Sequence, residues 1–257
     1  MIDPISSEHA LWIGQPLDMG SDLRAEKAHT LHLALMLRDT TVPRRASAAA
    51  EYVHRLMDMT VARHVTEAAA CTKGCHYCCA SFVGVTIPEV LSLAAHVRSD
   101  AALAQKIIGA AEEMRAVPQQ QRDLSGLFCA VLEAGLCGGY IARPIACRTM
   151  LSRSLSVCER FYVAGENIPI TRVAGAAEVR GRVELVFQAA LNLAQLPSQH
   201  VELTHALAIA LTNDDAEAQW LAGVPVFADV AVDRHEGKNE DLNKWTQILA
   251  DTVRPAL

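Results

Sequence analysis

All eight cysteines of the chain lie between positions 71 and 158. Four of them stand within nine residues, as Cys71, Cys75, Cys78 and Cys79 in CTKGCHYCC. Soft thiolates gathered in this way select zinc, copper(I) or iron–sulfur clusters. Disulfides are not needed as staples, because a chain of 257 residues with 51% apolar content can fill a hydrophobic core. The pattern therefore predicts a metal centre built from thiolates.

The remaining cysteines occupy a longer segment: Cys129, Cys137, Cys147 and Cys158. Eight thiols exceed the four ligands of one tetrahedral zinc site. The adjacent Cys78 and Cys79 also argue against a single simple zinc, because neighbouring side chains rarely fit one tetrahedron without strain. Two sites, or one polynuclear cluster with spare thiols, would account for the surplus. Zinc and an iron–sulfur cluster both stay open.

The first run could converge in either of two conformations. On an α-helix, at about 100° per residue, Cys71, Cys75, Cys78 and Cys79 share one face. On a knuckle-like turn the convergence would be similar, and Gly74 would supply the backbone freedom for it. Both conformations predict that the four thiols of this run lie together.

The second run contains CGGYIARPIACR, from Cys137 to Arg148, which has the form C-x2-Y-x2-R-P-x2-C-R. Together with CTKGCHYCC, it resembles the YkgJ-type cysteine-cluster family, which is named for CxxCxxCC and described as a zinc- or iron-chelating domain. The resemblance covers about residues 71 to 158, although the first gap here is three residues rather than two. It implies metal binding by all eight cysteines: Cys71, Cys75, Cys78, Cys79, Cys129, Cys137, Cys147 and, as the closing ligand, Cys158.

One related branch, the flagellin lysine N-methylases, joins such a cluster to methyl transfer from S-adenosylmethionine. The resemblance therefore implies an alternative function, an iron–sulfur-dependent protein lysine N-methyltransferase. Those proteins are longer, and this chain has no separate glycine loop of the methyltransferase type. Gly135, Gly138 and Gly139 lie inside the ligand loop, where we expect them to serve its turns. We prefer a metal-binding protein and leave catalysis open.

Two arginines could act on the thiolates directly. Four thiolates around Zn²⁺ or a 2+ iron–sulfur cube leave a net charge of −2, which Arg143 and Arg148 would offset as cofactor-binding donors to sulfur. An ordinary salt bridge is the alternative for both. We expect His76 to face solvent or to support the ligands rather than to be one, and Tyr140 to pack.

Three residues near the N-terminus form a separate candidate for a harder metal ion. Glu26, His29 and His32 follow one another at i, i+3 and i+6, close enough along a helix to share a ligand. The chain contains ten histidines, so such spacing arises readily by chance. We therefore expect structural roles for these three.

Apolar residues recur mostly at helical spacing and aromatic residues are only 5%, which predicts a mostly α fold. Ser21 is expected to cap a helix over 21–39, and Thr86 to Glu89 forms a capping box for a helix to about residue 97. Glycines and prolines make 135–169 irregular, and 224–233 alternates enough for a short strand. The other expected helices are 44–70, 101–116, 176–195, 199–211, 214–222 and 240–253.

The sequence thus predicts a single helical domain with an irregular, cysteine-rich metal-binding insert. Its parts are an N-terminal helical segment (1–70), the metal-binding region (71–160) and a C-terminal helical segment (161–257). A net charge of −6 argues against a nucleic-acid partner held through phosphates. No stretch approaches about 18 consecutive apolar residues, so no membrane span is expected. The N-terminus lacks the apolar core of a signal peptide, which favours a cytoplasmic protein.

Overall fold

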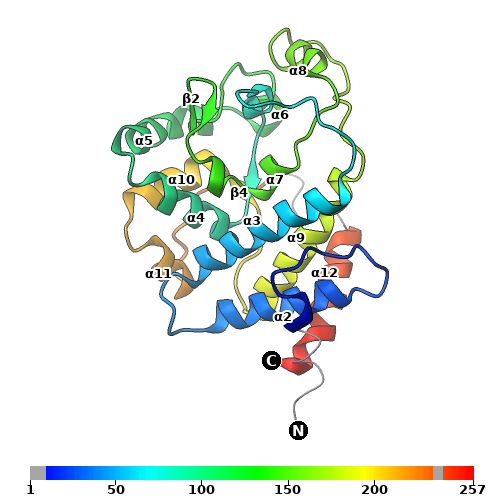
Figure 1. The fold of residues 1–257 in the computed structure, drawn as a ribbon. Helices are drawn as coiled ribbons and strands as arrows, with labels where there is room; N and C mark the ends of the chain where they lie inside the picture. The colour runs from blue at the N-terminus through cyan, green and yellow to red at the C-terminus, as the bar shows by residue number, and fades with distance from the viewer. Residues whose placement is uncertain (1–9, 234–239) are drawn as a thin grey trace.

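The computed structural model describes residues 10–233 and 240–257, and it confirms the mostly α fold (Figure 1). Helices account for 57% of the residues and strands for 5%. The long helices are α2 (Arg24–Arg38), α3 (Arg45–His64), α4 (Ile87–Val97), α5 (Ala101–Ala116), α9 (Ala176–Leu193), α10 (Leu203–Thr212) and α12 (Glu240–Val253). The short ones are η1 (Tyr77–Ala80), α6 (Gln119–Arg122), η2 (Tyr140–Ala142), α7 (Ile145–Arg148), α8 (Leu155–Tyr162), α11 (Ala216–Leu221) and η3 (Arg254–Ala256).

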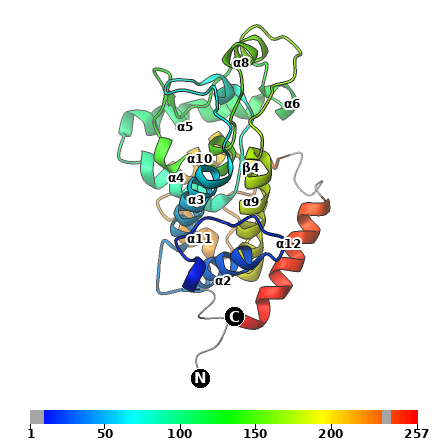
Figure 2. The same ribbon diagram turned by 45° about the vertical axis from the view of Figure 1, so that its right-hand side comes forward.

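The long helices pack around one hydrophobic core. Helix α9 lies against α2, α3 and α12, while α4 lies against α3 and α10, and α10 lies against α5. Figure 2 shows α12 along the outer side of α9. Apolar side chains removed from water contribute about 25 cal/mol per Å² to folding. The largest fully buried ones include a residue from each of these seven helices: Leu33, Leu56, Leu93, Ile107, Phe187, Leu207 and Leu249.

The two N-terminal helices differ from their predicted ends. Helix α2 begins at Arg24, so the prediction of Ser21 as its N-cap is wrong. Leu23 holds that position in the left-handed region with φ 55°. Helix α3 ends at His64 rather than at residue 70. Residues 65–70 contain no glycine or proline that would end the helix. The end of this segment is instead held by a hydrogen bond from the Ala70 N–H to the carbonyl of the distant Ser152.

Local signals located the next helices correctly. The Thr86 N–H donates to Glu89 Oε2 (3.0 Å), which confirms the capping box at the start of α4. Helix α4 ends at Val97, as predicted. The Asp100 carboxylate accepts a hydrogen bond from the Leu103 N–H (3.0 Å) and caps α5, which has the predicted bounds.

The strands are only two residues long each. Strand β1 (Gly84–Val85) pairs antiparallel with β4 (Val201–Glu202), and β2 (Leu132–Glu133) pairs with β3 (Leu136–Cys137). The predicted strand over 224–233 is wrong. That segment contributes one isolated antiparallel bridge, between Val232 and Val201.

The cysteine-bearing segments gather at one end of the molecule. Figures 1 and 2 place α6 and α8 at this end, and α2 and the C-terminus at the opposite end. Within 135–169, the predicted irregular region holds several short elements rather than none. Among the described residues, no helix has both the length and the apolarity to span a membrane. Residues 1–9, which entered the signal-peptide prediction, lie outside the described part of the chain.

Candidate metal centre

The first cysteine run forms a turn rather than an α-helix. The Cys75 N–H donates to the Thr72 carbonyl (3.0 Å), and Gly74 has a φ of +89°, which only glycine adopts without strain. A 3₁₀ turn, η1, then carries Cys78 and Cys79. Although a 3₁₀ turn rotates adjacent residues about 120° apart, the Cys78 and Cys79 thiols stay within hydrogen-bond reach of each other. The other thiols of this run, Cys71 and Cys75, line one cavity with Cys78.

Four cysteines line one small cavity of about 20 Å³: Cys71, Cys75, Cys78 and Cys158. We call them the first thiol group. The Ser152 N–H donates to Cys71 Sγ (3.4 Å), and the Ala70 N–H donates to the Ser152 carbonyl (2.8 Å). These two bonds explain why the chain leaves α3 early. The loop that precedes Cys158 holds residues 65–71 beside it.

The other four cysteines form a second thiol group: Cys79, Cys129, Cys137 and Cys147. The Cys129 N–H donates to the Cys79 carbonyl (2.7 Å), which ties the second run to the first. The β2–β3 pairing sets Cys137 opposite Leu132. The charges of Cys129 and Cys147 both raise the pKa of Cys79, and those of Cys129 and Cys137 raise that of Cys147. The charge of Cys78 also raises the pKa of both, so Cys78 lies within electrostatic reach of this group as well. The four thiols therefore lie within electrostatic reach of one another.

The adjacent Cys78 and Cys79 stand at the boundary of the two groups. A hydrogen bond from the Cys79 thiol stabilises the Cys78 thiolate and lowers its pKa to about 7. The same contact raises the pKa of Cys79. Arg143 and Arg172 also favour the Cys78 thiolate. Cys78 is therefore the thiol that ionises first near neutral pH.

Burial is the main influence on the ionisation of five further thiols. It raises the pKa of Cys129 to about 11, and it raises the pKa of Cys147 and Cys137 as well. In the first group, burial raises the pKa of Cys75 and of Cys158. Each of these thiols is held neutral by its surroundings, and a bound cation would reverse that preference.

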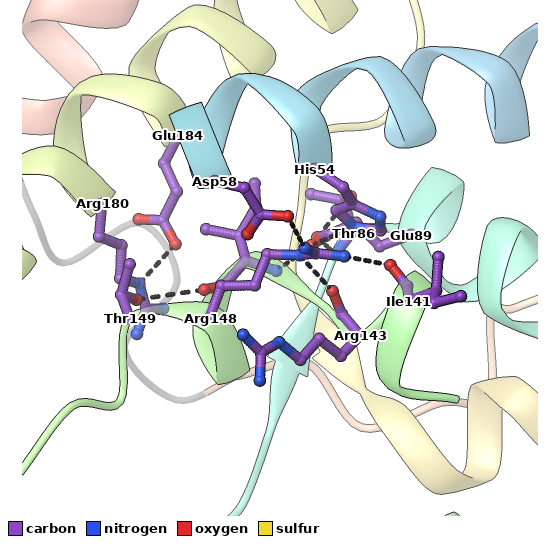
Figure 3. A network of polar contacts seen from close by, with 11 residues as sticks. His54, Asp58, Thr86, Glu89, Ile141, Arg143, Arg148, Thr149, Arg180 and Glu184 are labelled. Atoms are coloured by element: carbon purple, nitrogen blue, oxygen red, sulfur yellow. Dashed lines mark hydrogen bonds and ion pairs between the residues drawn. The ribbon is translucent and has the colours of Figure 1, made fainter. Parts of the chain in front are cut away.

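A buried carboxylate fixes the short helix that carries Cys147. Glu89 Oε1 accepts a hydrogen bond from the Ile145 N–H (2.8 Å) at the start of α7, while Oε2 accepts the Thr86 N–H. His54 Nε2 lies 3.6 Å from Glu89 Oε1 (Figure 3). Although burial opposes its charge, His54 and these N–H groups lower the pKa of Glu89 to about 2. The capping residue of α4 therefore also positions the second thiol group.

Arg148 bonds to oxygen atoms, as Figure 3 shows. Its Nε donates to the Arg143 carbonyl (2.7 Å), and its two terminal nitrogens donate to Asp58 and to the Ile141 carbonyl. The guanidinium is almost wholly buried. The alternative interpretation, a salt bridge, therefore describes Arg148 better than the prediction of a donor to thiolate sulfur. It fastens the 141–148 segment to α3.

Arg143 behaves differently from Arg148. Its guanidinium lies over the Tyr140 ring, 3.9 Å from the centroid, so Tyr140 supports a cation rather than packing in the core. Its positive charge favours the thiolate forms of Cys78, Cys137 and Cys147, although burial still raises the pKa of the last two. Arg143 thus faces both groups and suits the predicted role of a counter-charge.

His76, Glu26, His29 and His32 each contact groups other than the thiols, and His32 lies against the Tyr52 ring. His76 Nδ1 donates to the Gly74 carbonyl (3.0 Å), and its ring stacks on Tyr77. Glu26 pairs with Arg182 (2.8 Å), and His29 Nδ1 bonds to Tyr52 Oη (2.7 Å). These contacts are structural, as expected.

The donor set fits a thiophilic metal in type and number, but the thiols do not converge on a shared point. All eight cysteines are free thiols. Within the described residues, no group of three or more His, Cys, Asp or Glu side chains is arranged to hold a metal ion. Binding would thus require the thiols of each group to move together. Four cysteines per group match the ligand count of a zinc ion or an iron–sulfur cluster.

Comparison of the chain with protein-family models, with curated proteins and with solved structures finds no match in any of the three. The residues around the thiols must therefore be interpreted from their own contacts.

Several residues that shape this region were absent from the sequence-based candidates. Glu89 was identified only as a capping residue, and His54 only as one histidine among ten. Arg172 and Ser152 line the cavity of the first group. The capping box was the only sequence signal for any of them, because their other contacts join residues far apart in the chain.

Proposed function

We propose that this protein binds metal through two separate tetrathiolate centres. The first would use Cys71, Cys75, Cys78 and Cys158, and the second would use the other four cysteines. Each centre would hold a zinc ion or an iron–sulfur cluster. The observation that carries the proposal is the gathering of the cysteines at one end of a helical scaffold, where four of them surround one small cavity and the Cys129 N–H bonds to the Cys79 carbonyl beside it.

The charges around the thiols support this proposal. Four thiolates around a 2+ centre leave an excess of negative charge, which nearby guanidinium groups can offset. Arg143 acts on thiols of both groups, and Arg172 lines the cavity of the first. Bound metal would supply cross-links, because metal-binding energy becomes folding energy where the ligands are spread along the chain.

Metal analysis with an absorption spectrum tests the proposal on protein purified without oxygen. A brown preparation that absorbs near ~400 nm and contains stoichiometric iron would identify iron–sulfur clusters. A colourless preparation with stoichiometric zinc would identify zinc. Metal-free protein whose cysteines are paired in disulfides would refute the proposal.

Two single substitutions test the division into centres. Cys158→Ser should remove the metal of the first group alone, and Cys147→Ser should remove that of the second alone, so each variant should retain about half the metal. Ser156→Ala changes an exposed hydroxyl two residues from Cys158 and serves as the control. Loss of all metal in both variants would instead indicate one shared cluster.

A further inference from the structure

A second cavity, of about 390 Å³, lies outside the two thiol groups. Helices α3 and α4 form two of its walls, and the segment around Ile141, Ala142 and Arg148 forms the third. Its volume falls within the range of small-molecule sites. None of the residues that line it is a cysteine, so it stands apart from the proposed metal centres.

The floor of this cavity contains a buried hydroxyl. Ser92 lines it with an exposed fraction of 2%. In the described part of the chain, Ser92 Oγ has no hydrogen-bond partner, whereas the neighbouring His54 Nε2 faces Glu89 at 3.6 Å. Buried polar groups are nearly always hydrogen-bonded, so Ser92 Oγ indicates a site that a polar ligand completes.

Charges of alternating sign follow one face of α3 along the cavity: Arg44, Glu51, Arg55 and Asp58. Asp58 pairs with Arg148, and Arg55 also lies 5.9 Å from the Tyr52 ring centroid. Across the described residues, Arg44, Glu51 and Arg55 have no oppositely charged side chain within ion-pair distance. Exposed helix faces often alternate in this way, but few of them border a cavity with a buried polar floor.

The spacing of these charges defines a complementary molecule. Glu51 and Arg55 are one helical turn apart, about 6 Å along the axis, and Arg44 lies about 10 Å beyond Glu51. An ammonium group would suit Glu51, and a carboxylate would suit Arg55. A second acidic group could extend toward Arg44 and the nearby His96.

We propose that this cavity binds a small zwitterion of the acidic amino-acid type. Arg55 binds its α-carboxylate, Glu51 binds its ammonium group, and Ser92 contributes a hydroxyl from the floor. Because Ile141 and Ala142 line the same cavity, the ligand touches the segment between Cys137 and Cys147. The site does not depend on whether the thiols bind metal.

Calorimetric titration of the full chain tests this proposal with three related probes. L-glutamate carries both charges, glutarate lacks the ammonium group, and putrescine lacks the carboxylates. We expect saturable binding of L-glutamate, about tenfold tighter than that of either other probe. No saturable binding of L-glutamate would overturn the proposal. Equal binding of glutarate would reduce the site to one for simple anions and would also overturn it.

Substitutions locate the binding within the cavity. Arg55→Gln and Glu51→Gln each change an exposed side chain and should weaken L-glutamate binding about tenfold. Arg63→Gln changes an exposed arginine on the same helix outside the cavity and should have no effect.

Ser92→Ala separates binding from folding. Its hydroxyl lacks a partner in the described structure, so its removal should weaken L-glutamate binding without lowering the melting temperature. Unchanged affinity in all three cavity variants would show that L-glutamate binds elsewhere, and would overturn the assignment.

Discussion

Each of the two thiol groups contains four cysteines, but different parts of the fold hold the two groups in place. In the first group, Cys158 packs with Ala80 and Tyr162 in a small apolar cluster that is separate from the main core. In the second, Cys129 and Cys137 pack against the main core, and Glu89 anchors the helix that carries Cys147. One group depends on loops that hold one another, and the other on the helical scaffold.

This difference suggests how identical ligands can acquire different properties. We expect the group held by the helical scaffold to open only when the whole protein unfolds, and to contribute to its free energy of unfolding. The group held by loops should open by local unfolding, so its thiols should react faster with an alkylating reagent. The following four predictions test this contrast, in order of decreasing expected effect.

Glu89→Ala should have the largest effect. It removes the acceptor of the Ile145 N–H and leaves His54 facing an unfilled position, and breaking a buried pair costs about 3–5 kcal/mol. Urea unfolding measures the loss. Glu112→Ala, which breaks an exposed pair with Arg115, should cost less than about 1 kcal/mol. A cost below that level for Glu89→Ala would mean that the second group is not anchored by the scaffold.

Acid should loosen the second group through the same carboxylate. The pKa of Glu89 is about 2 in the folded chain, against an ordinary value of 4.5. Its contribution is therefore fully present above pH 4.5 and is lost as the pH falls toward 2. The shift corresponds to about 3 kcal/mol. Urea unfolding between pH 6 and 2 should show a flatter pH dependence for Glu89→Gln than for the parent chain; equal slopes would contradict this.

Alkylation should distinguish the groups in reduced, chelator-treated protein. Cys78, with a pKa of about 7, should react with iodoacetamide at pH 7.5 at least about tenfold faster than Cys129, with a pKa of about 11. Mass spectrometry of the labelled peptides gives the two rates, and Cys78→Ser identifies the fast phase. Equal rates would remove the predicted contrast in reactivity.

Tyr162→Phe should have the smallest effect. Tyr162 Oη and Ser81 Oγ share a hydrogen bond of 2.8 Å beside the first group. Its loss should cost about 1 kcal/mol in thermal or urea unfolding. Ser81→Ala should cost a similar amount, and the double variant should cost little more than either single one. A cost close to that of Glu89→Ala would mean that both groups depend equally on their surroundings.

The sequence predicted those features whose signals are local. Thr86 and Glu89 located the start of α4, because a capping box needs only four consecutive residues. The end of α3 was missed, because the bond from Ala70 to Ser152 joins residues far apart in the chain. The motif around Arg148 allowed both a donor to sulfur and a salt bridge, and its guanidinium holds Asp58 and two carbonyls.

The division of the cysteines was beyond reach of spacing arguments. Cys78 lines the cavity of the first group, whereas the Cys129 N–H bonds to the carbonyl of the adjacent Cys79. Neither fact follows from CTKGCHYCC alone, which is equally compatible with a helix. The sequence therefore located the thiols along the chain but not their neighbours in space.

If the two groups bind metal as proposed, the positions of their cysteines in the sequence also favour one order of assembly. Every cysteine of the second group lies between Cys78 and Cys158, so the chain that closes the second group is nested inside the loop that closes the first. If the second group forms first, the outer loop becomes effectively shorter, and the entropic cost of closing it falls. A chain emerging from the ribosome would also complete the inner loop before residue 158 appears. Sequence order and chain entropy therefore both favour maturation from the inside outward.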